Sequence, residues 1–198
     1  MVCLMNRGNQ KINVYAVRQL SVASSDRVLE IGFGGGSTLR HLIDKGRYLA
    51  AVDRSRVVIR RAESRFSQDV AVGKATFHEG TVDSLPFGQS SFHKILTVNT
   101  VYFWESLDSG FREIHRVVAP RGVMVVAFLP KEFMDKMGMP ADIFTSRTTE
   151  EIVTAVKKAG FSDVQIPKPE LNRGWAIVKC IRLMDQNSQD LGRVPDNR

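Results

Sequence analysis

The sequence predicts an α/β fold in a single domain, and three of its features support this prediction. First, the apolar run 28–31 breaks into four glycines within five positions and continues in a helix-like pattern, as at the start of a βαβ unit. Second, strand-like and helix-like segments alternate without interruption from residue 27 to residue 183. Third, a chain of 198 residues without an internal repeat has the length of one domain with a full core.

The composition is that of a soluble globular protein, with 43% hydrophobic and 25% charged residues. No apolar run approaches the ~20 residues of a membrane span, and the first twenty residues lack the apolar block of a secretion signal. The two cysteines, Cys3 and Cys180, form neither a metal-binding spacing nor a disulfide framework. We therefore expect a cytoplasmic protein with no metal site.

The predicted elements are an entry helix, five strands separated by helices or turns, and two closing strands. The entry helix, over residues 9–22, carries Ile12, Ala16 and Leu20 at helical spacing. Strands are predicted at 28–31, 48–53, 75–79, 93–98, 123–128, 164–166 and 175–183, and further helices at 38–46, 57–66, 111–118 and 148–159. From residue 184 on, polar residues with Gly and Pro indicate a loose tail.

The glycine turn after the first strand places an acidic residue and three glycines at alternate positions: Glu30, Gly32, Gly34 and Gly36. Glycine suits this turn because it adopts positive φ and leaves bare backbone against which a ligand can lie. A dinucleotide fingerprint, G-x-G-x-x-G, would need a glycine where the chain has Ser37. The spacing therefore argues against a nicotinamide dehydrogenase.

Asp53 ends the second predicted strand, 21 residues after Gly32. A carboxylate at this strand tip can accept hydrogen bonds from both hydroxyls of a ribose. The alternative is that Asp53 caps the helix after it, and the two roles do not exclude each other. Beside the glycine turn, ribose binding is the better interpretation.

Together with two later segments, these motifs resemble those of the class I S-adenosylmethionine (SAM) methyltransferases, over about residues 26–183. Residues 80–87 resemble the family's G-D-A-x-x-L-P-F segment, and residues 113–122 its E-x-x-R-V-L-x-P-G-G turn, which has a backbone role. The chain departs from the pattern at Thr81, Lys94 and Arg121. The resemblance implies a Rossmann-like, seven-stranded, mostly parallel sheet with one antiparallel strand near the edge and helices on both faces. It also implies methyl transfer from SAM by in-line displacement.

The resemblance assigns residues to a cofactor site and to an acceptor site. Its cofactor-binding positions correspond to Glu30, Gly32, Phe33, Gly34, Gly36, Asp53, Arg54, Thr81, Val82 and Asn99. Acceptor-binding positions are predicted at Tyr15, Tyr102 and Trp104, with core packing as the alternative for each ring. The resemblance aims none of the four histidines at the reacting methyl group. No general base or other catalytic residue is therefore predicted.

The overall pattern is most similar to the broad small-molecule group that includes the ubiquinone-biosynthesis methyltransferases. It implies a small-molecule acceptor, held between the N-terminal helix and the irregular segment 129–146, which we expect to form a lid. The methyltransferase domain would then span residues 1–183, with a helical cap at 1–25 and a flexible tail at 184–198.

Two alternatives from other functional classes remain open. An RNA-modifying methyltransferase is supported by the net charge of +7. The tightest basic cluster, within residues 54–65, is nevertheless typical of a solvated helix face. A non-catalytic SAM-binding module is supported by the departures at Thr81 and Lys94. The sequence predicts neither the acceptor atom nor the oligomeric state.

Overall fold

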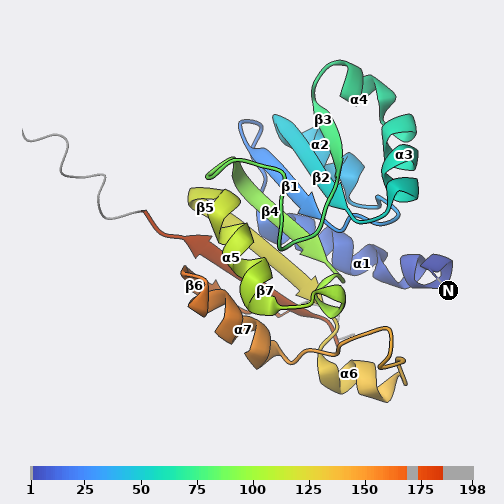
Figure 1. The fold of residues 1–198 in the computed structure, drawn as a ribbon, viewed down its shortest axis with the longest axis vertical. Helices are drawn as coiled ribbons and strands as arrows, with labels where there is room; N and C mark the ends of the chain where they lie inside the picture. The colour runs from blue at the N-terminus through green and yellow to red at the C-terminus, as the bar shows by residue number, and fades with distance from the viewer. Residues whose placement is uncertain (1, 169–173, 185–198) are drawn as a thin grey trace, which may run out of the picture.

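The computed structural model describes residues 2–168 and 174–184 of the chain. One sheet of seven strands lies at its centre (Figure 1). The strands are β1 (Arg27–Ile31), β2 (Tyr48–Asp53), β3 (Ala75–Glu79), β4 (Phe92–Val98), β5 (Val118–Phe128), β6 (Phe161–Gln165) and β7 (Ala176–Arg182). The second and third strands have the bounds that their apolar runs predict.

The strand order in the sheet is β3-β2-β1-β4-β5-β7-β6. Neighbouring strands from β3 to β5 are parallel, and β7 is antiparallel to both β5 and β6. The predicted Rossmann-like sheet, mostly parallel with one antiparallel strand near the edge, is thereby confirmed. Because β1 lies between β2 and β4, the strand order reverses there. The carboxyl ends of these three strands meet at one edge, where open α/β sheets bind ligands.

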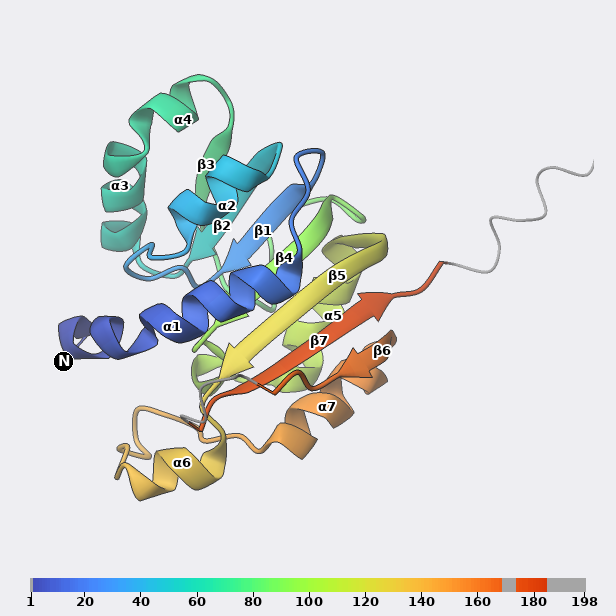
Figure 2. The same cartoon turned by 180° about the vertical axis from the view of Figure 1, so that it is seen from behind.

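Helices cover both faces of the sheet. They are α1 (Val2–Leu20), α2 (Leu39–Lys45), α3 (Arg56–Arg65), α4 (Ser67–Ala71), the 3₁₀ turn η1 (Val101–Phe103), α5 (Leu107–Val117), α6 (Lys131–Lys136) and α7 (Thr149–Lys158). Figure 2 shows α1 and α2 on one face, and Figure 1 shows α5 and α7 on the other. None of the helices within the described residues is both long and apolar enough to cross a lipid bilayer.

Two apolar layers hold these helices to the sheet. On one face, Ile12 and Leu20 of α1 are buried among residues of the central strands. On the other, Phe111 and Ile114 of α5 pack with Val156 of α7 and the opposite side of the same strands. Fully burying one such side chain contributes about 1.5–3 kcal/mol. The two layers therefore fix the positions of the strand ends at which a ligand would bind.

Several boundaries differ from those that the sequence predicts, and the largest differences are at the starts of α1 and β5. Helix α1 begins at Val2 rather than at residue 9, and β5 begins at Val118, where a turn was expected. Because β5 begins early, Arg121 lies within this strand, and its own φ is +62°. The family pattern has glycine at this position, and glycine is the residue that tolerates this conformation best. From residue 185 on, the predicted tail lies outside the described residues.

Candidate active site

The glycine turn between β1 and α2 has the backbone conformation that its sequence requires. Gly32, Gly34 and Gly36 have φ values of +73°, +48° and +68°, in the left-handed region that residues with a Cβ disfavour. A Cβ on Gly32 would lie 2.4 Å from Cγ2 of Thr100, whereas a Cβ on Gly34 would meet no atom within 4 Å. Gly32 thus packs against the segment after β4, and Gly34 presents bare, open backbone.

Asp53 at the end of β2 holds this turn through its carboxylate. Its Oδ2 accepts a hydrogen bond from the backbone N–H of Gly34 at 2.9 Å, and its Oδ1 accepts one from that of Ser55 at 3.0 Å. The N-cap of α3 is Ser55, whose hydroxyl accepts from the N–H of Val58, so Asp53 is not that cap. An ionised carboxylate has about four acceptor sites. Two therefore remain for the hydroxyls of a ribose.

Glu30 lies in β1, two residues before the glycine turn, and is 3% exposed. Its Oε1 accepts a hydrogen bond from the hydroxyl of Thr38, while its Oε2 is buried without a partner among the described residues. Burial raises the pKa of this carboxyl to about 7, against the effect of Thr38 and with a further contribution from Asp53. Because a buried acceptor without a donor is unfavourable, Oε2 fits an N–H donor or a cation supplied by a ligand.

Two further predicted cofactor positions have side chains in the core. Phe33 is 5% exposed and packs on Phe77, with ring centroids 5.6 Å apart. Val82 is 6% exposed and belongs to the apolar layer that includes α5. Thr81 is exposed and forms a β-bridge with Ser84. The side chains of Phe33 and Val82 are thus largely buried, and the cofactor contacts of all three residues stay predictions.

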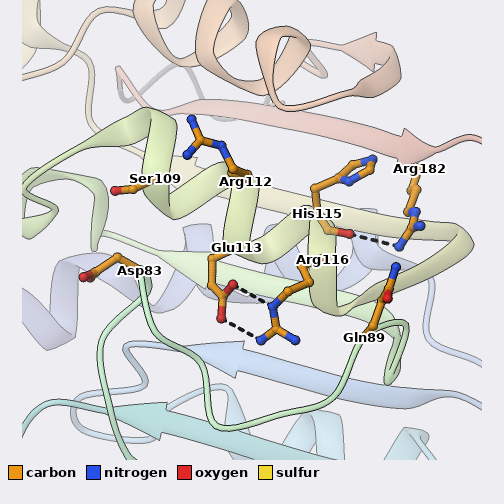
Figure 3. Close-up of a pocket in the computed structure, with 8 residues that line it drawn as sticks. All are labelled: Asp83, Gln89, Ser109, Arg112, Glu113, His115, Arg116 and Arg182. Carbon is orange, nitrogen blue, oxygen red and sulfur yellow. Dashed lines mark hydrogen bonds and ion pairs between the residues drawn. The ribbon is translucent and has the colours of Figure 1, made fainter.

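The segment 85–87 is held by Glu113 and Arg116 of α5, and the sequence analysis missed this role. Oε1 of Glu113 accepts from the N–H of Leu85 at 2.9 Å, and Arg116 donates to the carbonyls of Leu85 and Phe87 at 3.3 and 2.8 Å. The two side chains also pair at 2.7 Å (Figure 3), which lowers the pKa of Glu113 and raises that of Arg116. The available signal was their spacing, because residues three apart share a helix face.

A cavity of about 560 Å³ lies beside this pair (Figure 3). It is lined by charged and polar residues: Asp83, Gln89, Ser109, Arg112, Glu113, His115, Arg116 and Arg182. No predicted cofactor or acceptor residue lines it, and neither the glycine turn nor the end of β4 contributes to it. We therefore place the candidate active site at the carboxyl edge of the sheet and not in this cavity.

The end of β4 is joined to the end of β5 through Tyr102. Asn99, which follows β4 with a φ of +58°, donates its N–H to the carbonyl of Ala127 at 2.8 Å. Its Oδ1 accepts from the hydroxyl of Tyr102 at 3.2 Å, and that hydroxyl accepts from the N–H of Leu129. Burial raises the pKa of Tyr102. The Tyr102 hydroxyl is therefore a neutral group that orients Asn99 and leaves the Asn99 amide N–H groups for a ligand.

The three aromatic residues after β4 do not all face the core, because successive residues of a 3₁₀ turn point in different directions. Tyr102 and Trp104 are 4% and 6% exposed and lie in the core, which favours core packing over their predicted acceptor contacts. Phe103, which lies between them in the run predicted near the acceptor, is 42% exposed. Its ring centroid lies 5.2 Å from that of Phe144 and 5.4 Å from the guanidinium carbon of Arg54. Arg54, predicted as a cofactor contact, thus lies over Phe103.

Helix α1 reaches both the glycine turn and the segment after β6. Asn13 is 9% exposed and donates from Nδ2 to the hydroxyl of Ser37 at 2.7 Å. Tyr15 is half-buried and donates its hydroxyl to the carbonyl of Lys168 at 3.0 Å. An acceptor contact of Tyr15 stays a prediction, and Asn13 is the α1 side chain that meets the glycine turn.

None of the four histidines lies in the segment that follows β4, where Asn99 is found. His93 lies at the amino end of β4, His78 lies on β3, and His41 and His115 lie on α2 and α5. Burial lowers the pKa of His78. In the part of the chain that the structure describes, no group of three or more His, Cys, Asp or Glu side chains is arranged to hold a metal ion. No histidine therefore belongs to the segment at the end of β4, and a catalytic base stays unassigned.

Known proteins resemble this chain in sequence. Residues 29–126 match the family described as "Methyltransferase domain". The chain is 26% identical to YdaC, an uncharacterized methyltransferase of Bacillus subtilis, over 178 residues that cover 85% of this chain and 92% of that protein. It is 21% identical to erythromycin 3″-O-methyltransferase of Saccharopolyspora erythraea, over 92% of this chain and 66% of the relative.

Solved structures share the fold. A SAM-dependent methyltransferase from Aquifex aeolicus superposes with a TM-score of 0.71 at 17% identity, covering 86% of this chain and 89% of the other. The family match at residues 29–126 contains the glycine turn, Asp53, the segment 80–87 and Asn99. Residues 29–126 of this chain therefore match the methyltransferase-domain family, and the fold of the chain is that of the SAM-dependent methyltransferases.

Proposed function

We propose that this chain transfers the methyl group of SAM to a small-molecule acceptor by in-line displacement. The proposal depends above all on one observation, the grouping of Glu30, Gly34 and Asp53 at the carboxyl edge of β1 and β2. Oε2 of Glu30 is buried without a donor, the backbone at Gly34 is open, and Asp53 is half-buried with acceptor sites to spare. An ammonium group and a ribose, both present in SAM, match these two carboxylates in chemical type.

The residues around the edge bind and orient the two reactants. Asp53 would accept hydrogen bonds from the ribose hydroxyls, and Oε2 of Glu30 would accept one from the ammonium group. The backbone of Val82 and the hydroxyl of Thr81 would meet the adenine ring. Asn99 would lie near the sulfonium, because strand ends of a parallel sheet carry side chains into the ligand site.

Catalysis would come from positioning and from excluding water. Bound SAM supplies a methyl group that is already activated by its cationic sulfonium. Proximity and alignment alone can then supply about 7–11 kcal/mol of the barrier reduction. Three contacts hold the relevant segments: Asp53 with the turn, Glu113 and Arg116 with residues 85–87, and Tyr102 with the ends of β4 and β5.

A small molecule is favoured over RNA as the acceptor. In the basic cluster, Arg56 pairs with Glu79 at 2.5 Å and Arg65 lies 5.1 Å from the ring centre of Phe66, so part of the positive charge is engaged within the chain. Between β4 and β5 the chain has only η1 and α5, which leaves little protein for a large acceptor surface. One relative is named erythromycin 3″-O-methyltransferase, and erythromycin is a small molecule.

Mass spectrometry of a cell extract incubated with the protein and methyl-labelled SAM tests this proposal. We expect one labelled small molecule and an equal amount of S-adenosylhomocysteine (SAH). Gly34→Val is the control, because a branched side chain would fill the open space beside Asp53 and is strained at this φ. Label in RNA would support the RNA alternative instead. SAM binding without labelled product from any extract would indicate a non-catalytic module.

A further inference from the structure

An arginine and a phenylalanine meet across the carboxyl edge of the sheet. Arg54 follows β2, Phe103 lies in η1 after β4, and β1 lies between these two strands. The Arg54 guanidinium carbon is 5.4 Å from the centre of the Phe103 ring. The two side chains therefore span the end of β1, which carries the glycine turn, and form what we name the Arg54–Phe103 bridge.

The bridge carries a positive charge that no acidic side chain neutralises. Arg54 is exposed and forms no hydrogen bond or ion pair within residues 2–168 and 174–184. By contrast, Arg56, two residues further on, pairs with Glu79. A guanidinium that lies on an aromatic face keeps its planar fork of N–H donors, which matches the two oxygens of a carboxylate. The bridge is therefore suited to attract an anion.

An exposed apolar surface continues from the bridge toward the segment after β5. Phe103 contacts Phe144, and the N–H of Thr145 donates to the carbonyl of Tyr102 at 3.1 Å, which ties this segment to η1. Ile143, next to Phe144 in the chain, is 53% exposed. Figure 1 shows that this segment, with α6, lies at the carboxyl end of β5. Exposed apolar side chains beside a reaction site are typical of a surface that binds an apolar ligand.

The segments around Phe103 offer no histidine as a base for the acceptor. The four histidines lie outside η1 and the segment 129–146, and the hydroxyl of Tyr102 is hydrogen-bonded to Asn99 and Leu129, with a pKa that burial raises. Glu30, whose carboxyl also has a raised pKa, is assigned to the ammonium group of SAM in the proposed function. An acceptor atom that is already nucleophilic when it arrives therefore fits this side of the site. Among nucleophiles that need no base, a site with an uncompensated cation favours an anion over an amine.

We propose that the acceptor is a small aromatic acid whose carboxylate is methylated to an ester, an inference that rests on the proposed function and names its substrate class. The ring lies against Phe103, and Arg54 attracts the carboxylate. One carboxylate oxygen bonds to the methyl carbon as the S–C bond breaks, and the electron pair of that bond goes to sulfur. No proton is transferred. The anion and the sulfonium become two neutral products, so the ester loses its attraction to Arg54 and dissociates.

Binding of two matched probes, 2-naphthoate and 2-naphthamide, tests this inference. They have nearly the same shape and differ in charge, and both are titrated by calorimetry into protein saturated with SAH. We expect 2-naphthoate to bind about fivefold or more tightly than 2-naphthamide. Arg54→Gln should abolish this difference. Arg61→Gln, which removes an exposed charge of α3, should leave it unchanged, and Phe103→Ala should weaken both probes.

The outcomes separate this inference from the proposed function. Equal affinity for the two probes, an unchanged ratio in Arg54→Gln, or no binding of either probe to SAH-saturated protein would each overturn the aromatic-acid acceptor while the SAM site stands. Failure of SAH itself to bind, measured before the probes are added, would overturn the proposed function instead.

Discussion

The proposed cofactor side and the proposed acceptor side of this site are built in different ways. The cofactor side consists of a backbone turn with three glycines at positive φ and two carboxylates, all within residues 30–53. The proposed acceptor side consists of side chains that meet from distant segments, Arg54 with Phe103 and Phe103 with Phe144. The comparison teaches that the conformation of a backbone turn can be predicted from the residues of that turn. The arrangement of side chains from distant segments depends instead on how those segments pack in the folded protein.

The largest expected effect separates two glycines of the same turn. In Gly32→Ala the new Cβ would lie 2.4 Å from Cγ2 of Thr100, so the segment after β4 must move. We expect a loss of about 2–5 kcal/mol in the free energy of unfolding, from the strained φ and the clash together. Gly34→Ala meets no neighbour and should lose only the ~1–2 kcal/mol of the strained φ. Urea denaturation measures both, and equal losses would contradict this distinction.

Asp53→Asn tests whether the cofactor side also needs a charge. We expect SAM affinity to fall by about 10- to 100-fold, since hydrogen bonds to a charged group contribute ~1.5–3 kcal/mol. Calorimetry with SAM measures the loss. Asp44→Asn is the matched control, because Asp44 is exposed on α2 and pairs only with Arg40 at 3.4 Å within the described residues. An unchanged dissociation constant in Asp53→Asn would mean that this carboxylate serves the glycine turn alone.

The same comparison explains what the sequence could and could not predict. The sheet and its glycine turn were predictable because apolar runs and turn glycines act over a few neighbouring residues, and Asp53 stands directly at the end of one such run. Which of three adjacent rings faces solvent was not, because Tyr102 turns inward to meet the N–H of Leu129, 27 residues later in the chain. The cofactor contact of Arg54, predicted from its position after β2, stays a prediction, and the contact with Phe103 on which we base its proposed role toward the acceptor appears only in the folded structure.

The Glu113–Arg116 pair tests this comparison further, because here two side chains hold a backbone segment on the proposed cofactor side. Arg116→Lys keeps the charge but cannot hold both carbonyls of the segment 85–87. We expect about a tenfold loss of affinity for SAM and for 5′-methylthioadenosine alike, since both contain adenine. The melting temperature should fall by about 2–4 °C for each kcal/mol lost.

Arg112→Lys is the control for this pair, because Arg112 lies on the same helix, lines the same cavity and contacts neither carbonyl. A lower melting temperature in Arg116→Lys with unchanged affinity for both ligands would assign the pair to stability alone. The pair would then be a contact between distant segments, like those of the proposed acceptor side, but it would not contribute to ligand binding.

The smallest expected effect is a pH dependence that comes from Glu30. Its pKa is raised from 4.5 to about 7 in the folded protein, so the folded state holds a proton that the unfolded chain releases. This contribution to stability is therefore complete below about pH 4.5 and is lost as the pH rises to about 7. Chemical denaturation between pH 5 and 7.5 measures this loss, and Glu30→Gln should flatten the profile.

SAM binding should depend on pH in the opposite direction, because a cationic ligand favours the ionised carboxylate of Glu30. Near pH 6.5 binding should release protons, and affinity should rise up to about tenfold for each unit by which the ligand lowers the pKa. Calorimetry in two buffers of different ionisation enthalpy counts these protons. The 2-naphthoate probe, which binds on the other side of the site, should release none. If SAM also releases none, Oε2 of Glu30 does not face the ammonium group, and the cofactor side depends on its backbone and Asp53 alone.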